Sequence, residues 1–274
     1  MNAQEIKKAK ELYISGESLS EIGRQLNHHS MTIKKYLEKE GVHFRTRAEQ
    51  NAISNAKLKK SVNEKYFNKI GVNQAWLMGF IAADGTIRKD RNSIKIGLSS
   101  IDKEILEKIK EEVQIERPIL NYLTNNGFAV SQLEWTSKNH KDFLAKYGIV
   151  NNKTYLPLHL PKDFNEEQKL AFILGYFDGD GSISRQDEYL RFRICSHRDE
   201  ILQDIAKFFI SKYNNLEFSI SKDKRNLWEL SISTKYAKQI FLDMYNLNSL
   251  RLNRKFQKFL EYINHETTTS QPKG

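Results

Sequence analysis

Hydrophobic and polar positions repeat with two different periods along this chain, and the changes of period predict its elements. The stretch SIKIGLS at 93–99 alternates apolar with polar or small residues, as YLRFRIC at 189–195 does, which is typical of half-buried strands. In both places a short strand and an apolar helix come before, and a stretch with helical spacing follows. Two further strands and a closing helix complete each series. The pattern therefore predicts an α+β protein in which the order αββαββα occurs twice.

The two series are copies of one unit. The segment LMGFIAADGTI (77–87) returns as ILGYFDGDGSI (173–183), which places Asp84 and Asp180 96 positions apart (180 − 84). The match continues without a gap through the following hairpin and helix. Near the end of each copy, the segment LEWTSK aligns with LSISTK, so that Lys138 corresponds to Lys235. Both lysines lie where the last predicted strand ends and the following helix begins. A duplication of this length predicts two half-domains, residues 71–160 and 161–264, around a pseudo-two-fold axis.

Small residues recur at helical spacing in both repeated motifs. Gly79 and Ala83 lie four positions apart, as do Gly175 and Gly179, so each predicted helix carries a strip on which another backbone can approach closely. We therefore expect the two motif helices to pack against each other. Their C-terminal ends would then lie side by side.

An aspartate stands in the last turn of each motif helix, where the helix dipole disfavours a carboxylate. We expect Gly85 and Gly181 to cap these helices in the left-handed conformation, with Asp84 and Asp180 adjacent. Two close carboxylates repel each other unless a cation lies between them, and oxygen ligands suit Mg²⁺, for which Mn²⁺ can substitute. The expected metal ligands are the carboxylates of Asp84 and Asp180 and the last-turn carbonyls of Ala83 and Gly179.

Composition and charge narrow the class of protein. The 274 residues contain 44 Lys and Arg against 34 Asp and Glu, a net charge of +10 that favours nucleic acid as the partner. The single cysteine, Cys195, excludes internal disulfides and cysteine-based zinc sites. The N-terminus lacks a signal-peptide core, and no apolar stretch would span a membrane. We expect a protein that is not secreted and works where the host DNA lies, in the cytoplasm, nucleoid or an organelle matrix.

Both motifs resemble the signature helix of the LAGLIDADG homing endonucleases, and the two-motif, single-chain members are similar in layout. The resemblance covers residues 70–264 and implies a monomer whose two four-stranded sheets form a saddle over double-stranded DNA. It implies that Asp84 and Asp180 are metal-binding catalytic acids, and that Lys138 and Lys235 polarise the scissile phosphate or its attacking water. One departure is that the sixth motif position is Ala82 in the first copy and Asp178 in the second.

Outward strand positions are the candidate DNA contacts of the saddle, since Arg and Lys there can read guanine edges or hold phosphates. These candidates are Arg88, Lys95, Arg191 and Arg193.

The N-terminal region lies outside this resemblance. Residues 1–43 carry three stretches with helical spacing, of which the last two resemble a helix-turn-helix, with Ser18 and Ser30 as expected N-caps. Its expected core is Ile22, Leu26, Ile33 and Leu37, and its expected DNA contacts are Ser30, Thr32, Lys34 and Lys35. Residues 44–70 form a basic linker in which Arg45 and Arg47 are further candidates. The polar tail, 265–274, is expected to be disordered.

The resulting prediction is a monomeric, site-specific DNA endonuclease that makes double-strand breaks across the minor groove of a long pseudo-palindromic site with divalent metal. Two alternatives share this fold, namely a non-cleaving DNA-binding regulator and an RNA maturase that binds intron RNA and assists its folding. The presence of both Asp84 and Asp180 argues against the regulator.

Overall fold

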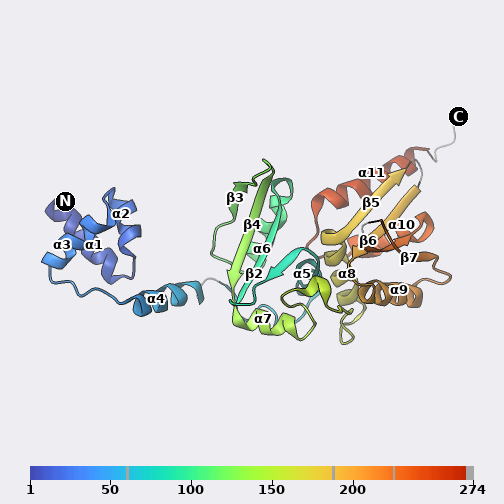
Figure 1. Ribbon diagram of the computed structural model, residues 1–274. Coiled ribbons are helices and arrows are strands. Elements are labelled where there is room, and N and C mark those ends of the chain that lie inside the picture. The colour runs from blue at the N-terminus through green and yellow to red at the C-terminus, as the bar shows by residue number, and fades with distance from the viewer. Residues whose placement is uncertain (60–61, 187–188, 225, 270–274) are drawn as a thin grey trace. The chain divides into compact units, whose positions relative to one another are not determined.

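The chain consists of two compact units, residues 1–60 and 61–274 (Figure 1). The computed structural model describes residues 1–59, 62–186, 189–224 and 226–269. Each unit has a hydrophobic core of its own.

The N-terminal unit is helical. Its first three helices enclose a small core of Ala9, Tyr13, Ile22, Ile33 and Leu37, with Leu26 packed against it. Ser18 accepts a hydrogen bond from the backbone N–H of Glu21 and so caps the second helix, as predicted. The helices are α1 (Ala3–Ile14), α2 (Leu19–Leu26), α3 (Ser30–Lys39) and α4 (Arg47–Lys59).

One predicted cap in this unit was wrong. The residue before α3 is His29, whose Nδ1 accepts a hydrogen bond from the N–H of Met31 at 3.3 Å, and Ser30 is the first helical residue. The second helix ends at Asn27 in the left-handed conformation, which leaves only two residues for the turn into α3. With so short a turn, α3 begins one residue earlier than predicted, and His29 takes the N-cap position instead of Ser30.

The C-terminal unit contains the predicted duplication. The first repeat consists of α5 (Val72–Asp84), β1 (Gly85–Ile87), β2 (Ser93–Ser99), η1 (Ser100–Asp102), α6 (Lys103–Glu112), β3 (Leu120–Leu123), β4 (Ala129–Thr136) and α7 (Lys138–Ala145). The 3-10 helix η2 (Lys153–Tyr155) lies between the repeats. The second repeat consists of α8 (Glu166–Asp180), β5 (Gly181–Gln186), β6 (Tyr189–Ser196), α9 (Glu200–Lys212), β7 (Phe218–Lys222), β8 (Trp228–Ile232) and α10 (Thr234–Tyr245), and α11 (Asn253–Thr269) follows it.

Each repeat builds one antiparallel four-stranded sheet. The strand orders, β1-β2-β4-β3 and β5-β6-β8-β7, are equivalent and confirm the predicted fold class. The apolar members of the alternating strands face the helices: Ile94 and Ile96 in the first sheet and Phe192 and Ile194 in the second are fully buried. The opposite members, including Lys95 and Arg191, therefore line the outer faces of the two sheets.

Helices α5 and α8 lie between the two sheets and pack against each other along their length (Figure 1). A Cβ atom at Gly79 would lie 2.0 Å from the carbonyl oxygen of Phe172, and one at Gly175 would lie 1.9 Å from that of Trp76. The two backbones therefore touch, as the strips of small residues predicted. This contact brings the C-terminal ends of both motif helices to the same place.

The two glycines that end these helices are not left-handed caps. Gly85 has φ −76° and ψ 153°, and Gly181 has φ −93° and ψ 165°, which is extended backbone open to any residue. Steric crowding requires glycine at both positions. A Cβ atom at Gly85 would lie 2.6 Å from the carbonyl oxygen of Ile81, and one at Gly181 would lie 2.2 Å from Cδ2 of Phe177. The chain passes directly from helix to strand at both sites.

The expected boundaries of the linker and the tail also differ from the structure. Residues 62–70 of the expected linker pack on the first repeat, where Tyr66 and Phe67 are buried and the carbonyl oxygen of Asn63 lies 2.9 Å from His140 Nε2. Helix α11 continues to Thr269, so the first five residues of the expected tail (265–269) are helical. The remainder, 270–274, lies outside the described residues.

Because the α5–α8 contact leaves no room for a methyl group, we expect Gly175→Ala to destabilise the C-terminal unit by about 1–3 kcal/mol. Urea unfolding followed by circular dichroism measures this change. Gly97→Ala is the matched control, since a Cβ there has no atom within 4 Å, and its free energy of unfolding should stay within about 0.5 kcal/mol of the parent. Equal stabilities for the two variants would contradict the close backbone contact.

Candidate functional site

The two motif aspartates come together where α5 and α8 end. The position that a Cβ of Gly179 would take is 3.4 Å from Cγ of Asp84, so the carboxyl group of one helix lies against the last turn of the other. Both Asp84 and Asp180 keep exposed surface although protein atoms surround them on several sides. A solvent-borne ligand can therefore reach both carboxylates.

The surroundings of these carboxylates disfavour their charged forms. Partial desolvation raises the pKa of Asp84, while the ammonium groups of Lys255 and Lys153 oppose the shift. Desolvation raises the pKa of Asp180 to about 6, and the neighbouring charge of Asp84 adds to the increase. Water that reaches the exposed oxygens screens both effects. A cation beside the pair would stabilise the ionised forms.

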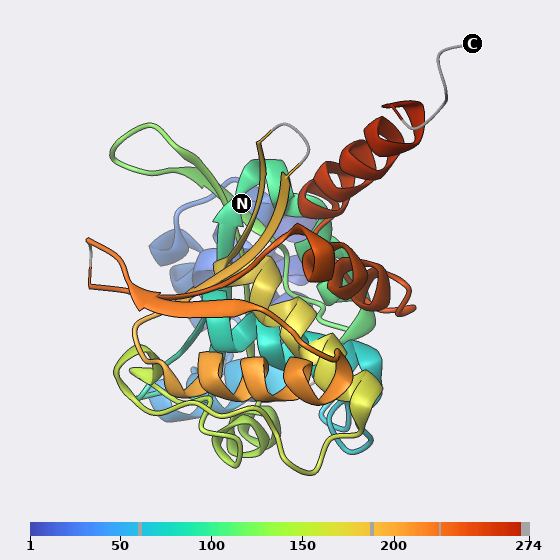
Figure 2. The same ribbon diagram turned by 90° about the vertical axis from the view of Figure 1, so that its right-hand side faces the viewer.

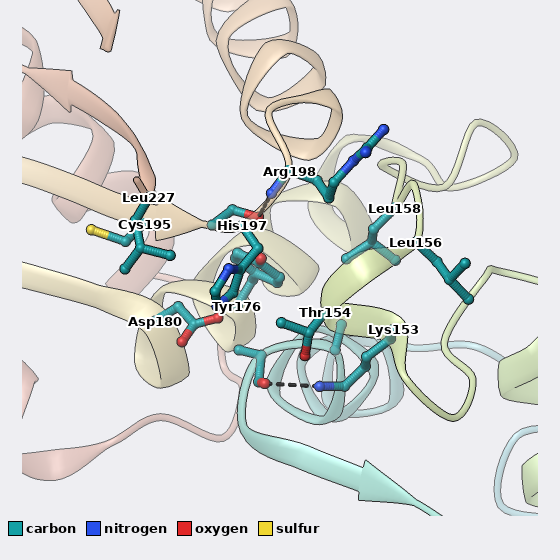
Figure 3. A pocket seen from close by; sticks show the side chains of 13 residues that line it. Lys153, Thr154, Leu156, Leu158, Tyr176, Asp180, Cys195, His197, Arg198 and Leu227 are labelled. Atoms are coloured by element: carbon teal, nitrogen blue, oxygen red, sulfur yellow. Dashed lines mark hydrogen bonds between the residues drawn. The ribbon is translucent and has the colours of Figure 1, made fainter. Parts of the chain in front are cut away.

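Lys153, from the segment between the repeats, supplies one positive charge. Its Nζ donates a hydrogen bond to the carbonyl oxygen of Ala83 at 3.0 Å, at the end of α5 (Figure 3). Burial lowers the pKa of this ammonium group, and the carboxylates of Asp180 and Asp84 oppose that shift.

Lys255, in the first turn of α11, supplies a second positive charge near the aspartates. Its side chain is almost fully buried, and its Nζ donates to the carbonyl oxygens of Phe177 at 2.6 Å, Asp178 at 2.8 Å and Gly181 at 2.6 Å. The carbonyl oxygen of Gly179 lies 3.5 Å away. Burial lowers the pKa of Lys255 to about 8. Each motif helix thus ends against an ammonium group that comes from outside its own repeat motif.

The structure does not bring Lys138 and Lys235 to this site. Strand β2 pairs with both neighbours so that Gly85 of β1 and Leu133 of β4 lie at the same level. Lys138 comes five residues further on (138 − 133), which at ~3.3 Å per residue is roughly 16 Å away. The second repeat has the same register, so Lys235 lies equally far from Asp180. Nζ of Lys138 lies 3.8 Å from Oδ2 of Asp142 in its own helix.

A cavity of about 130 Å³ opens beside Asp180 (Figure 3). Asp180 and Lys153 lie on its wall, and the imidazole of His197 points into it from the end of β6. Its other lining residues are Ala82, Ala83, Thr154, Leu156, Leu158, Tyr176, Cys195, Ser196, Arg198 and Leu227.

The basic residues predicted for the saddle lie on the outer faces of the two sheets. Arg88 follows β1, with its Nε 3.9 Å from Oε1 of Glu134, and Lys95 lies opposite Glu134 in the strand register. Arg191 and Arg193 project from β6 on the face opposite the buried Phe192. Basic side chains thus occupy the same face in both repeats.

The N-terminal candidates fall into two groups. Lys35 and Arg47 are exposed, while Ser30, Thr32 and Lys34 are half-buried along α3. Arg45 has a structural role instead.

The guanidinium group of Arg45 stacks 4.0 Å from the ring centroid of Tyr13 and donates to the carbonyl oxygens of Tyr13 and Glu17 at 2.9 and 2.7 Å. It therefore joins the chain after α3 to the end of α1. Its predicted place among the DNA contacts is not supported.

Oxygen atoms at the helix ends could hold a divalent metal. The described residues contain no group of three or more His, Cys, Asp or Glu side chains that could bind one, so the carboxylates of Asp84 and Asp180 would act with backbone carbonyls and water. Such a partial shell fits Mg²⁺, which commonly keeps water molecules and uses one or two carboxylates together with substrate phosphates. The carbonyl oxygen of Ala83 retains a second lone pair beside its bond to Lys153.

Comparison with known proteins identifies the family. The model of the LAGLIDADG-like domain matches residues 71–148 and 167–246, one copy in each repeat. These segments make up more than half of the chain, which therefore belongs to the LAGLIDADG family.

Two curated proteins are similar to much of this chain. A DNA-directed RNA polymerase subunit, Rpo1C, of Methanocaldococcus jannaschii is 26% identical over 204 residues, which cover 73% of this chain and 22% of that protein. An uncharacterised protein of the same organism is 24% identical over 197 residues, which cover 65% of this chain and 70% of its own length. The chain thus spans about a fifth of the polymerase subunit that it matches.

A solved structure shares the fold. The homing endonuclease I-WcaI bound to its DNA recognition sequence superimposes with a TM-score of 0.51 at 13% identity, covering 78% of this chain and 94% of that one. The homing endonuclease I-DmoI in complex with DNA and Mn gives a TM-score of 0.43 at 17% identity, with coverage of 62% and 94%. Within the described part of the chain, no helix is both long and apolar enough to span a membrane.

The raised pKa of Asp180 predicts a pH-dependent effect on stability. The folded state binds the Asp180 proton more tightly than the unfolded state, so this group contributes less stability as pH rises from about 4 to 6. Without divalent metal, Asp180→Asn should therefore stabilise the protein at pH 7, by about 1 kcal/mol after screening, and the gain should vanish below pH 4. Thermal unfolding in EDTA at several pH values measures it.

Two further measurements complete this test. The exposed turn variant Asp90→Asn should leave the unfolding temperature unchanged at every pH. Added Mg²⁺ should raise the unfolding temperature of the parent more than that of Asp180→Asn. A loss of stability in Asp180→Asn at pH 7 in EDTA would contradict the raised pKa of Asp180.

Proposed function

We propose that the protein is a site-specific endonuclease that cuts both strands of a DNA duplex with the help of a divalent metal ion. The observation that carries this proposal is the pair of solvent-accessible carboxylates, Asp84 and Asp180, held together by a backbone contact between two helices. Family membership and the fold shared with a DNA-bound homing endonuclease support it. Because both halves are in one chain, the active form is a monomer.

The metal would be held by the carboxylates of Asp84 and Asp180 with the last-turn carbonyls of Ala83 and Gly179, and the preferred ion is Mg²⁺, with Mn²⁺ as a substitute. A bound divalent ion supplies a water of lowered pKa and neutralises charge on a phosphate. The two carboxylates are already positioned by helix packing, so little rearrangement is needed to bind the ion.

Lys153 and Lys255 take the role that the sequence had suggested for Lys138 and Lys235. One ammonium group is held by carbonyl oxygen at the end of each motif helix, Lys153 at α5 and Lys255 at α8. A scissile phosphate beside the aspartates would meet a fixed positive charge on either strand, which stabilises the negative charge that builds up during hydrolysis. Two ammonium groups, one at each helix end, match the two scissile phosphates of a duplex.

The outer faces of the sheets would contact the DNA on both sides of the cut. Arg88 and Lys95 in the first repeat and Arg191 and Arg193 in the second can hold phosphates or read guanine edges in the major groove. Because the two faces differ in sequence, the preferred site is at most pseudo-palindromic.

The N-terminal unit would add a second DNA contact. Its α2 and α3 meet across a short turn, as in a helix-turn-helix, and Ser30, Thr32, Lys34 and Lys35 lie on the candidate recognition helix. The stretch that follows is basic, with Arg47 exposed at the start of α4. Linked binding units strengthen one another by raising the effective concentration of the second contact.

Selection from a randomised duplex library in Mg²⁺, followed by sequencing of the cut ends, identifies the site and tests the proposal. We expect Asp84→Asn and Asp180→Asn each to abolish double-strand cleavage of that site, because each variant removes a metal ligand. Both should still bind the duplex in EDTA, as measured by fluorescence anisotropy. Full cleavage by either variant would contradict the assignment.

The lysines give a matched comparison within the same assay. Lys153→Met and Lys255→Met should slow cleavage at least about tenfold, whereas Lys138→Met, which removes an exposed ammonium remote from the aspartates, should not. A larger loss in Lys138→Met than in Lys153→Met would restore the assignment made from the sequence.

Removal of the N-terminal unit tests its role. A shortened chain that begins at Ser61 keeps the whole C-terminal core and should still cut the selected site at low salt. It should protect a shorter stretch of DNA on one side and lose affinity at physiological salt, because fewer phosphates are neutralised. Footprinting and anisotropy on the same duplex measure both effects. An unchanged footprint with equal affinity would assign residues 1–60 another role.

A further inference from the structure

The segment that carries Lys255 to the motif helices is anchored to both repeats. We call residues 250–255, which join the second repeat to α11, the C-terminal strap. The N–H of Leu250 donates to Oδ1 of Asn73 at 3.0 Å, near the start of α5. The N–H of Leu252 donates to Oδ2 of Asp178 at 2.9 Å, in the last turn of α8. The strap therefore contacts both motif helices, and α11 follows it as the red helix of Figure 2.

The strongest anchor reaches the first repeat. Arg254 donates from Nε and Nη2 to both carboxylate oxygens of Asp102, at distances of 3.0 to 3.3 Å. The side chain of Asp102 is only 9% exposed, so this two-pronged ion pair is shielded from water on one side. A planar guanidinium bound at two points fixes direction as well as distance. It therefore fixes the first turn of α11, in which Lys255 is the next residue.

A second anchor explains the departure at the sixth motif position. Asp178 is buried and accepts hydrogen bonds through Oδ2 from Nε1 of Trp76 and from the N–H of Leu252, each at 2.9 Å. It thus joins α8, α5 and the strap at one atom. The first repeat has Ala82 at this position and cannot make that connection. The Lys255 side of the site accordingly has an anchor that the Lys153 side lacks.

From these contacts we propose that Arg254, Asp102 and Asp178 are positioning residues that hold the Lys255 ammonium group against the end of α8 and so determine how fast one particular DNA strand is cut. The proposal rests on the endonuclease function argued above. None of the three residues contacts the scissile phosphate in this scheme, because each acts through Lys255. An ammonium group displaced by about 1 Å can lose most of its effect on a transition state, on the order of a hundredfold in rate.

The test follows each strand separately. A duplex that carries the selected site and a different fluorophore on each strand reports two nicking rates. Lys255→Met and Lys153→Met first show which strand depends on which lysine. Arg254→Gln should then slow the Lys255 strand by roughly tenfold or more, leave the other strand within about twofold, and accumulate nicked duplex. Arg254→Lys, which keeps one of the two bonds, should recover part of the lost rate.

Lys103→Gln serves as the control variant in the same nicking assay. Lys103→Gln removes the same charge and breaks an exposed ion pair with Glu107 beside Asp102, and both strands should be cut at the parental rates. Equal slowing of both strands by Arg254→Gln would show a merely structural role and overturn the proposal. Unchanged rates on both strands would overturn it as well.

Hydrogen exchange separates this proposal from the endonuclease function, because it needs no cleavage. In Arg254→Gln the amides of residues 250–259 should exchange faster while those of α5 and α8 remain protected, whether or not the protein cuts DNA. Unchanged protection of 250–259 would overturn the anchoring role. Faster exchange in a protein that cuts no duplex would leave the anchor established and refute the endonuclease proposal instead.

Discussion

The backbone contact between α5 and α8 is the constraint on which the rest of the C-terminal unit depends. Gly79 and Gly175 allow each helix to lie directly on the carbonyl groups of the other, so both helices end at one point. Two negative helix ends and the carboxylates of Asp84 and Asp180 therefore accumulate there. Positive charge must be brought to that point, and the chain supplies Lys153 and Lys255 from segments far away in the sequence.

The positive charge near the aspartates comes from segments outside the motif helices, so the site depends on the folding of the whole C-terminal unit. A lysine in place of Asp84 or Asp180 would satisfy the helix dipole locally, but it would remove a carboxylate from the site. Lysines that approach from outside leave both carboxylates in place and are held by carbonyl oxygens. Each sheet stays attached to the site because β1 and β5 begin directly after the motif helices.

Much of the fold could be predicted from the sequence because the hydrophobic periodicity and the duplication are both visible in the order of the residues. The alternation around Ile96 and the strips around Gly79 each report a local geometry, and the structure confirms both. The lysines that lie at the ends of the motif helices could not be found in this way, since Lys153 and Lys255 belong to segments without a repeating pattern. The contacts of Arg45 could not be predicted for a related reason, because the sequence alone does not show whether an arginine stacks on a ring such as Tyr13 or faces solvent.

The strap follows both motif helices in the sequence, so Lys255 is synthesised after the two carboxylates that it accompanies. Both motif helices leave the ribosome before the strap, so they can pack while one of the two ammonium groups is still missing. Domains generally fold as they emerge, the N-terminal parts first. A nascent chain at that stage would have its two carboxylates together but would lack the Lys255 ammonium group, which reaches the end of α8 only when the first turn of α11 docks on Asp102.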